Sequence, residues 1–227
     1  MATQSIAQHP ALEGTGQGQA PFGFPVSLTE KYRPRRIADF AGLGKQRKIL
    51  SKFAANPYPS AWLFLGASGT GKTTMALALA TEIGAEVHHI PSQECNVQNL
   101  ADVIRMCWYV PQGGGFHLVL VDEADQMSNA AQLALLSKMD STAFPPMTIF
   151  VFTCNATDRL EARFLSRCRK LEFSTYGLGP EITRLLKQVW NEEAPDAQTP
   201  NFARIVKDSA NNARDALTKL ELALMEA

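Results

Sequence analysis

The chain has 227 residues, enough for one α/β domain and a small second unit. Its 22 basic side chains balance 22 acidic ones, so the zero net charge gives no global argument for a nucleic-acid partner. No apolar run approaches the roughly 18–20 residues that a membrane span needs. The first 25 residues also lack the pattern of a signal peptide. We therefore expect a protein with a buried core and no membrane partner.

The four cysteines are Cys95, Cys107, Cys154 and Cys168. None forms a C-x-x-C pair, and no set of Cys and His has the spacing of a zinc site. We expect them to be small apolar core residues. Unpaired cysteines of this kind favour a reduced, cytoplasmic setting.

Residues 1–26 are rich in Gly, Gln, Ala and Pro, which predicts a flexible tail. A basic stretch follows, in which eight Lys or Arg side chains and two acidic ones lie between Glu30 and Lys52. The basic stretch could contact nucleic-acid phosphates, or it could pack around a nucleotide and contact neighbouring subunits. Residues 56–60, Asn-Pro-Tyr-Pro-Ser, then form a turn-rich approach to a strand.

From Ala61 onward, short apolar runs alternate with segments of helical spacing. We predict strands at residues 62–65, 86–90, 117–121, 147–153 and 171–173. We predict helices at residues 72–83, 97–109, 129–139 and 159–167. Because the strands are almost continuously apolar and alternate with helices, we expect an α/β fold with a parallel sheet sandwiched by helices.

The strands stop after Gly177. Helical spacing continues over residues 180–190, 202–209 and 214–225, and Pro195 and Pro200 interrupt the middle of this region. These segments predict a small helical lid. We expect a nucleotide-binding domain over residues 27–176 and the lid domain over residues 177–227.

A phosphate-binding loop lies between the first predicted strand and helix. The run Gly66-Ala67-Ser68-Gly69-Thr70-Gly71-Lys72-Thr73 fits G-x-x-x-x-G-K-[ST] in the context that this motif requires. Its backbone N–H groups and the positive end of the following helix favour phosphate. We expect Lys72 to reach the β- and γ-phosphates of ATP, Thr73 to ligate Mg²⁺, and Thr74 to complete the loop.

Two carboxylates follow the most apolar predicted strand. Leu118-Val119-Leu120-Val121 leads into Asp122 and Glu123, at the edge of the sheet where ligands bind in open α/β folds. We expect Asp122 to orient the Mg²⁺ shell and Glu123 to polarise the water that attacks the γ-phosphate. The alternative is that these carboxylates only cap the next helix.

Together these motifs resemble the AAA+ clamp-loader family, which includes replication factor C small subunits and the bacteriophage and bacterial clamp-loader ATPases. The resemblance covers residues 29–220 and implies a P-loop AAA+ fold. Glu30-Lys31-Tyr32-Arg33-Pro34 looks like the family's E-K-Y-R-P segment, which packs around the adenine, so Tyr32, Arg33 and Pro34 are expected to contact the nucleotide. Asp122-Glu123-Ala124-Asp125 is similar to the family's acidic box.

The resemblance implies three further site residues. Asn155 closes Phe152-Thr153-Cys154-Asn155 as sensor 1 does, and Ser166-Arg167-Cys168 matches the motif whose arginine acts on the neighbouring subunit's ATP. Arg214 resembles the sensor 2 arginine of the lid, although Asn211 stands where the family usually has glycine. Alternatives are a strand-end cap for Asn155, a surface ion pair for Arg167 and a solvated arginine for Arg214.

The implied function is an ATPase subunit of a clamp-loader-like DNA replication complex, which hydrolyses MgATP at subunit interfaces with Arg167 acting in trans. Implied partners are other AAA+ subunits, identical or not, primer–template DNA bound without sequence preference, and a sliding clamp. The helices after Pro91 and Met127 occupy the DNA-facing positions of the family. Polar residues there could contact phosphates, or could be plain helix caps at Asn96 and Ser128: Gln93, Asn96, Gln98, Ser128 and Asn129.

Other functions stay open. The same ATPase core could serve a helicase loader or a DNA-remodelling AAA+ protein, a nucleotide-gated binding module, or a purely structural subunit. Two departures from the family are visible. The spacing between the phosphate loop and the acidic box excludes the four-cysteine zinc module of bacterial members, and loader subunits usually continue into a third helical domain beyond the lid.

Overall fold

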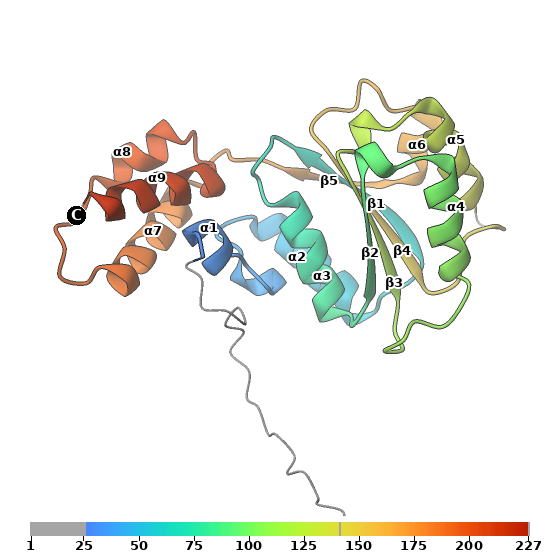
Figure 1. Ribbon diagram of the computed structural model, residues 1–227, viewed down its shortest axis with the longest axis horizontal. Helices are drawn as coiled ribbons and strands as arrows, with labels where there is room; N and C mark the ends of the chain where they lie inside the picture. Colours follow the sequence, from blue (N-terminus) through green and yellow to red (C-terminus); the bar gives the residue numbers. More distant parts are fainter. Residues whose placement is uncertain (1–25, 141, 227) are drawn as a thin grey trace, which may run out of the picture.

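The computed structural model describes residues 26–140 and 142–226, so the tail predicted for residues 1–26 lies outside the described residues apart from Val26. Figure 1 shows a sheet covered by helices, with a group of helices beside it. The strands are β1 (Ser60–Gly66), β2 (Glu86–Pro91), β3 (His117–Asp122), β4 (Thr148–Cys154) and β5 (Arg169–Phe173). The α-helices are α1 (Leu28–Lys31), α2 (Gly44–Ala55), α3 (Lys72–Glu82), α4 (Val97–Met106), α5 (Asn129–Lys138), α6 (Ala162–Arg167), α7 (Gly179–Glu193), α8 (Phe202–Asp208) and α9 (Ala213–Met225).

The five strands form one parallel sheet in the order β2-β3-β4-β1-β5. Strand β4 lies between β3 and β1, and all seven of its residues are buried. A strand with both faces covered reads as a continuous apolar run, as β3 and β4 do in the sequence. The predicted α/β fold with a parallel sheet is therefore confirmed.

Helices cover both faces of the sheet because side chains alternate between the faces along each strand. On one face, Leu63, Val119 and Phe152 pack with α4, α5 and α6. On the other face, Phe64 and Leu120 pack with α2 and α3. Figure 1 shows these two helical layers on opposite sides of the strands.

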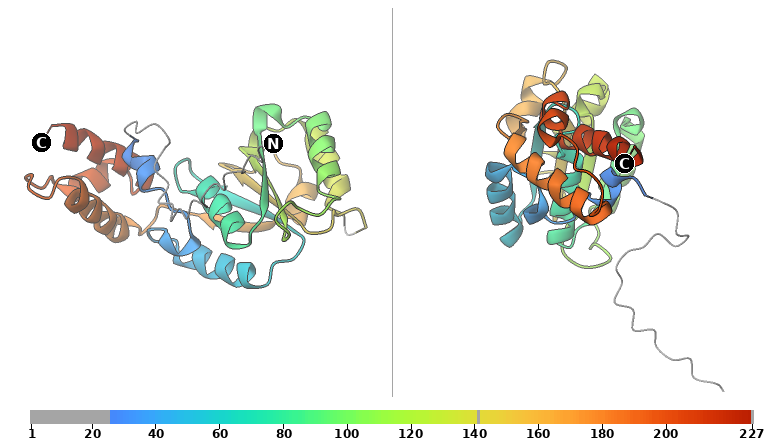
Figure 2. Two further views of the ribbon diagram at one scale, coloured as in Figure 1. Left: turned by 60° about the horizontal axis from the view of Figure 1, so that its bottom comes forward. Right: turned by 90° about the vertical axis from the view of Figure 1, so that its left-hand side faces the viewer.

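A third apolar cluster holds the remaining helices together beside the sheet (Figure 2). Its largest buried side chain is that of Trp190, which is 2% exposed. Leu28 of α1 joins this cluster, so a segment that precedes the sheet packs with helices that follow it. The division at residue 177 stays a prediction, and α1 makes its main contacts on the lid side of that division.

The predicted elements differ from the structure at several ends. The helix predicted for residues 97–109 ends at Met106, because the chain turns there toward Pro111 and three glycines. The helix predicted for residues 159–167 begins at Ala162. Helix α2 was not predicted, since only Leu50 and Phe53 of its 12 residues are buried and its other residues read as a basic stretch. No helix among the described residues is long and apolar enough to cross a membrane.

Replacing Phe152 by alanine should lower the free energy of unfolding by about 3–5 kcal/mol. Its side chain is fully buried at the centre of the sheet, and its ring centroid lies 4.8 Å from that of Phe164. Denaturant unfolding followed by circular dichroism measures the loss. As a control, Tyr176→Ala removes an aromatic ring that is 93% exposed and should cost less than about 0.5 kcal/mol. Equal losses in the two variants would contradict this account of the core.

Candidate nucleotide-binding site

Two adjoining cavities lie at the carboxyl ends of β1, β3 and β4. One has a volume of about 350 Å³ and the other about 220 Å³. The larger is lined by predicted residues from four separate segments of the chain: Ser68, Gly69, Gly71, Lys72, Thr73, Thr74, Asp122, Glu123, Asn155 and Arg214. The smaller is lined by predicted residues from both ends of the chain and from the phosphate loop: Tyr32, Arg33, Pro34, Gly69, Thr70, Gly71, Thr74 and Arg214.

The glycines of the phosphate loop allow its close approach to neighbouring segments. Gly69 has φ +77° and Gly71 has φ +88°, in the left-handed region that favours glycine. A Cβ atom at Gly69 would lie 2.5 Å from the Asn212 amide nitrogen, and one at Gly66 would lie 2.1 Å from the Phe173 carbonyl oxygen. Side chains at these two positions would therefore collide with the lid and with β5.

Lys72 lies at the first position of α3 and is 8% exposed. Its Nζ donates to the carbonyl oxygens of Gly66 at 2.6 Å and Ala67 at 2.9 Å, and to Asn155 Oδ1 at 3.1 Å. Burial lowers the pKa of Lys72. Gly66 and Ala67 line neither cavity, and their carbonyl groups instead hold the lysine in place.

Three oxygens converge at the end of β3. Thr73 Oγ1 donates to Asp122 Oδ1 at 2.8 Å, and Thr153 Oγ1 donates to the same oxygen at 2.9 Å. On its other side, Asp122 Oδ2 lies 2.7 Å from His89 Nε2. A hydroxyl and a carboxylate at this separation, beside a phosphate cradle, are the donors that Mg²⁺ takes in such sites, so Thr73 and Asp122 fit the ion.

Glu123 follows Asp122 in an unusual backbone conformation. Its φ is +51°, a left-handed value that costs a non-glycine residue free energy and that clusters at functional sites. The Glu123 N–H donates to Thr153 Oγ1 at 3.1 Å, which holds this turn. The Glu123 side chain makes no cap hydrogen bond to the turn that follows, and Ser128 caps α5 instead. The capping alternative for the acidic pair is therefore wrong.

Asn155 lies directly beyond β4 and lines the larger cavity. Its Oδ1 accepts from Lys72, which leaves the amide NH₂ of Asn155 to donate to another oxygen. The Asn155 side chain thus accepts a hydrogen bond from Lys72 instead of capping the strand end.

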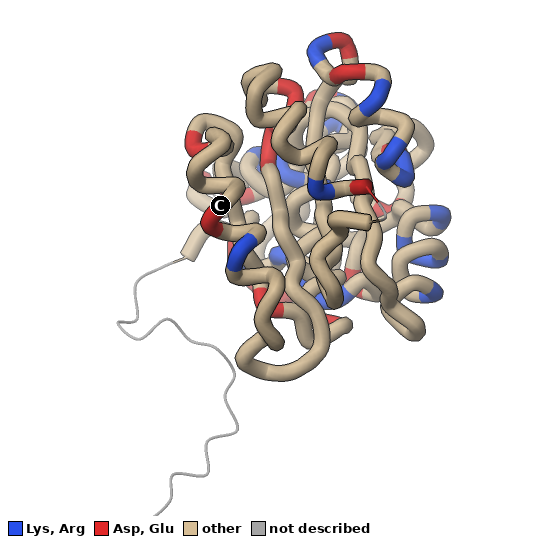
Figure 3. The backbone as a smooth tube through the Cα atoms, turned by 90° about the vertical axis from the view of Figure 1, so that its right-hand side faces the viewer, with Lys and Arg blue, Asp and Glu red and all other residues tan. Residues whose placement is uncertain are grey.

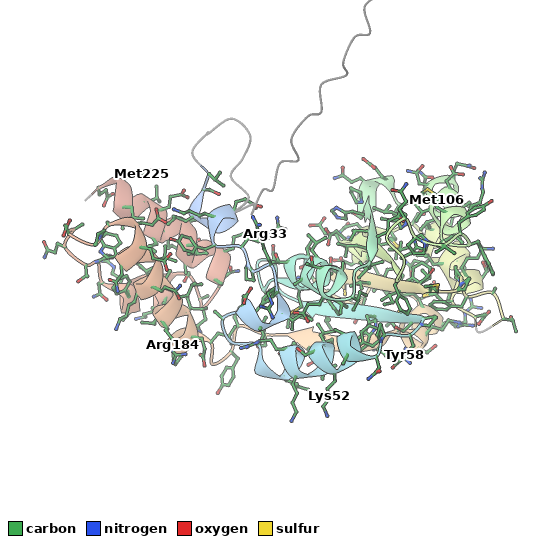
Figure 4. The ribbon with its side chains drawn as sticks, turned by 90° about the horizontal axis from the view of Figure 1, so that it is seen from below. Arg33, Lys52, Tyr58, Met106, Arg184 and Met225 are labelled. Carbon is green, nitrogen blue, oxygen red and sulfur yellow. The ribbon has the colours of Figure 1, made fainter. Side chains whose placement is uncertain are left out.

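The smaller cavity lies between the sheet and the lid, and Figure 4 shows Arg33 at this junction. Its apolar lining comes from both sides, with Phe40 from the segment before α2, and Leu185 and Leu217 from α7 and α9. Tyr32 lines the cavity, and its hydroxyl donates to the carboxylates of Glu192 and Glu193 on α7. Burial and these two carboxylates raise the pKa of Tyr32.

The lid contacts the phosphate loop through Asn212. Its Nδ2 donates to the Ser68 carbonyl oxygen at 2.8 Å, while its Oδ1 accepts from the N–H groups of Arg214 and Asp215 and so caps α9. Arg214 lines both cavities, beside this cap. Asn211, which replaces the family's usual glycine, has φ +58°, and asparagine tolerates this conformation better than most residues.

Arg167 lies apart from these residues and lines neither cavity. Its Nη2 and Nε donate to Asp140 Oδ1 at 2.7 and 3.1 Å, and its Nη1 donates to the Arg163 carbonyl oxygen at 3.1 Å. In the single chain, the surface ion pair that was the alternative interpretation is thus present. Action of Arg167 on a neighbouring subunit remains a prediction.

Several residues of the site were not predicted. His89 and Gln93 line the larger cavity at the end of β2, and Asn212 joins the lid to the loop. Short sequence patterns carry only a weak signal for these residues, since the position of each depends on which strand or loop lies beside it. Of the polar residues considered for DNA, Asn96 accepts from Asn99 N at 2.9 Å and Ser128 from Ala131 N at 3.2 Å, so the capping interpretation is confirmed for both.

The basic stretch is divided between two places. Arg33 lines the smaller cavity, and Lys31 pairs with Glu193 of α7 at 2.7 Å. Lys45, Lys48 and Lys52 are exposed on one face of α2, where Figure 3 shows basic residues repeating along a helix. Only the first part of the stretch therefore contributes to the nucleotide cavities.

The comparisons with known proteins agree with this geometry. Residues 62–176 match the family model described as "ATPase family associated with various cellular activities (AAA)". The chain is 31% identical over 202 residues to a replication factor C small subunit of Picrophilus torridus, covering 85% of this chain and 62% of that protein. It is 30% identical to human replication factor C subunit 4, covering 94% of this chain and again 62% of that protein.

The chain thus spans about three fifths of the length of these curated relatives. Among solved structures, the RuvB Holliday junction branch migration motor of Thermotoga maritima has a TM-score of 0.69 at 20% identity, over 86% of this chain and 72% of that one. A likeness at this identity supports the fold alone. With the family model matching half of the chain, the protein belongs to the AAA family of ATPases, and it is similar to replication factor C small subunits.

Proposed function

We propose that this chain is an ATPase subunit of a clamp-loader-like complex and that it hydrolyses MgATP at the interfaces between subunits. The observation that carries the proposal is the convergence of Lys72, Asp122, Glu123 and Asn155 in one cavity. The similarity to replication factor C subunits favours a clamp loader over a helicase loader or a DNA-remodelling protein.

Each residue has a role that its contacts support. The phosphate loop and Lys72 would hold the phosphates, while Thr73 and Asp122 would ligate Mg²⁺, which neutralises the charge that develops there. The exposed Glu123 carboxylate would orient and deprotonate the attacking water. The Asn155 amide group would donate to the water or to the γ-phosphate. Tyr32, Arg33 and Pro34 would contact the adenosine in the smaller cavity.

Replacing Glu123 by glutamine should leave ATP binding within about twofold and lower the rate of hydrolysis by about 10²–10⁴-fold, because the amide cannot take the proton. Binding is measured with a fluorescent ATP analogue and hydrolysis by phosphate release. Lys72→Ala is the contrasting variant, since it should abolish the binding itself. A Glu123→Gln protein that hydrolyses ATP at the normal rate would refute the role of this carboxylate.

The proposal assigns Arg167 to the ATP of a neighbouring subunit. The guanidinium lies on α6, outside both cavities of its own chain, and one side of it remains accessible. A cation that reaches the γ-phosphate stabilises the charge of the transition state and contributes roughly 10³–10⁵ in rate. A chain that lacks a neighbour would therefore hydrolyse ATP slowly, and assembly would be part of the chemistry.

Arg167→Ala should lower hydrolysis by about 10³–10⁵-fold without weakening ATP binding. Arg163→Ala, at an exposed arginine one turn earlier on α6, is the matched control and should retain activity. The decisive measurement mixes Arg167→Ala with Glu123→Gln, because each variant supplies the group that the other lacks. Activity that returns on mixing, and that rises with protein concentration, supports action in trans. No recovery in the mixture would argue for an arginine that acts only within its own chain.

An exposed apolar segment lies near the start of β3, at the end of the strands opposite the two cavities. This segment supports contact with a protein partner. Met106 is the last residue of α4, and Trp108, Tyr109 and Val110 follow the helix; the four are 47%, 53%, 72% and 76% exposed. Figure 4 shows Met106 at the far end of the molecule from Met225. Contiguous exposed apolar residues often mark interaction sites, and aromatic residues dominate binding energies there. We assign this segment, residues 106–110, to contact with the sliding clamp.

Trp108→Ser combined with Tyr109→Ser should weaken capture of the sliding clamp in the presence of ATP by tenfold or more, since losing buried aromatic anchors commonly costs about 2 kcal/mol. Tyr176→Ser, at an exposed tyrosine far along the chain, is the control. Hydrolysis stimulated by primer–template DNA should change little in the double variant. Clamp capture that is equal in all three proteins would remove this segment from the interface.

A further inference from the structure

Three side chains of types that can ligate a metal ion lie close together outside the nucleotide site. They are His88 on β2, Cys107 at the end of α4 and His117 at the start of β3, and their ligating atoms all lie within 4.8 Å of one another. Cys107 is fully buried, His117 is 2% exposed and His88 is half-buried. Their wide separation in the sequence explains why no zinc motif was visible there.

The register of the sheet brings the two histidines together. Glu86 pairs with His117, and His88 pairs with Val119, so His88 and His117 are diagonal neighbours on one face of the sheet. Val119 and Cys107 belong to the same apolar cluster, under α4. The last turn of α4 therefore places the Cys107 sulfur over the two imidazole rings.

The hydrogen bonds of His117 set its tautomer. His117 Nε2 lies 2.9 Å from the Tyr109 carbonyl oxygen, an acceptor, so this nitrogen carries the proton. Nδ1 of the neutral ring then presents a lone pair, and His88 Nε2 lies 2.9 Å from it. A histidine whose other nitrogen donates to a backbone carbonyl is the usual arrangement of a metal ligand.

We propose that His88 Nε2, Cys107 Sγ and His117 Nδ1 bind one Zn²⁺ ion. Two imidazoles and a thiolate are ligands that zinc prefers, and a tetrahedral ion with Zn–N bonds of about 2.0–2.1 Å needs ligating nitrogens about 3.3 Å apart. His88 Nε2 and His117 Nδ1 now lie 2.9 Å apart, so the two rings would separate slightly to admit the ion. The fourth position is taken by water or by the Glu86 carboxylate, whose Oε2 lies 3.9 Å from His117 Nδ1.

Binding moves two protons and no electrons. Burial raises the pKa of Cys107 to about 11, so the free thiol is protonated at neutral pH, and zinc displaces that proton to water as the Zn–S bond forms. Burial lowers the pKa of His88, so its ring is neutral. The His88 proton transfers from Nε2 to Nδ1, which frees the second lone pair.

The ion would join two strands of the sheet to Cys107, which belongs to the segment of residues 106–110. The Tyr109 carbonyl group already accepts from His117, so the exposed Trp108 and Tyr109 side chains would be held in one orientation. This consequence rests on the proposed function of that segment. The metal site itself uses none of the nucleotide-binding residues.

The test titrates Co²⁺ into the full chain after removal of metals, with saturating Mg²⁺ and ATP present to occupy the nucleotide site. We expect one equivalent of tetrahedral Co²⁺, with visible bands and a thiolate-to-cobalt charge-transfer band that added Zn²⁺ abolishes. Absence of the charge-transfer band would overturn the proposal, because an ion bound without a thiolate is not at Cys107. The charge-transfer band does not depend on ATP hydrolysis. Its absence would therefore contradict the metal site without contradicting the proposed function.

Variants identify the ligands. His88→Gln and Cys107→Ser should each weaken Zn²⁺ binding by more than about 100-fold, since loss of an outer partner alone commonly costs 10- to 100-fold. Cys95→Ser, at a buried cysteine of the same cluster, and His89→Gln, at the neighbouring histidine of the nucleotide cavity, should bind Zn²⁺ normally. Circular dichroism checks that each variant folds. If Cys107→Ser unfolds, the test rests on His88→Gln, because His88 is only half-buried. Normal zinc affinity in His88→Gln would overturn the assignment.

Discussion

The parallel pairing of β1, β4 and β3 is the constraint on which the rest of the site depends. Because the three strands run side by side in one direction, the phosphate loop after β1, the acidic pair after β3 and Asn155 after β4 meet at one edge. Short hydrogen bonds then join them across strands: Lys72 to Asn155, and Thr73 and Thr153 to Asp122. Lys72, Asp122 and Asn155 are therefore each positioned by a neighbour from another segment, as preorganised catalysis requires.

The lid closes the same edge, so residues of the sheet domain and of the lid together line the two cavities. Asn212 stabilises the first turn of α9 and contacts the phosphate loop with the other end of its amide. Gly69 has no side chain at the point of contact, so the two segments approach closely. Tyr32 joins the smaller cavity, which we propose for the adenosine, to α7 through two carboxylates. A change in lid position would therefore alter both cavities together.

Sequence reasoning reached the parts of this structure that local pattern determines. The strand alternation, the loop from Gly66 to Thr73 and the carboxylates after β3 follow from residue types at short spacing, and the structure places them as expected. His89 and Asn212, by contrast, enter the site through the register of β2 and the docking of the lid, which no short pattern encodes. Helix α2 was missed because burial of two residues in 12 leaves little apolar periodicity. The pairing of His88 with Cys107 and His117 likewise arises only in three dimensions.

The ion pair between Arg167 and Asp140 has a consequence for how subunits would come together. Both side chains are partly exposed, at 32% and 52%, and an exposed pair of this kind contributes roughly 0–1 kcal/mol. So weak an attachment gives little resistance when the guanidinium leaves Asp140. Under the proposed role, Arg167 would leave one carboxylate for the more highly charged triphosphate of an arriving neighbour, and it would give up little stabilising free energy in doing so.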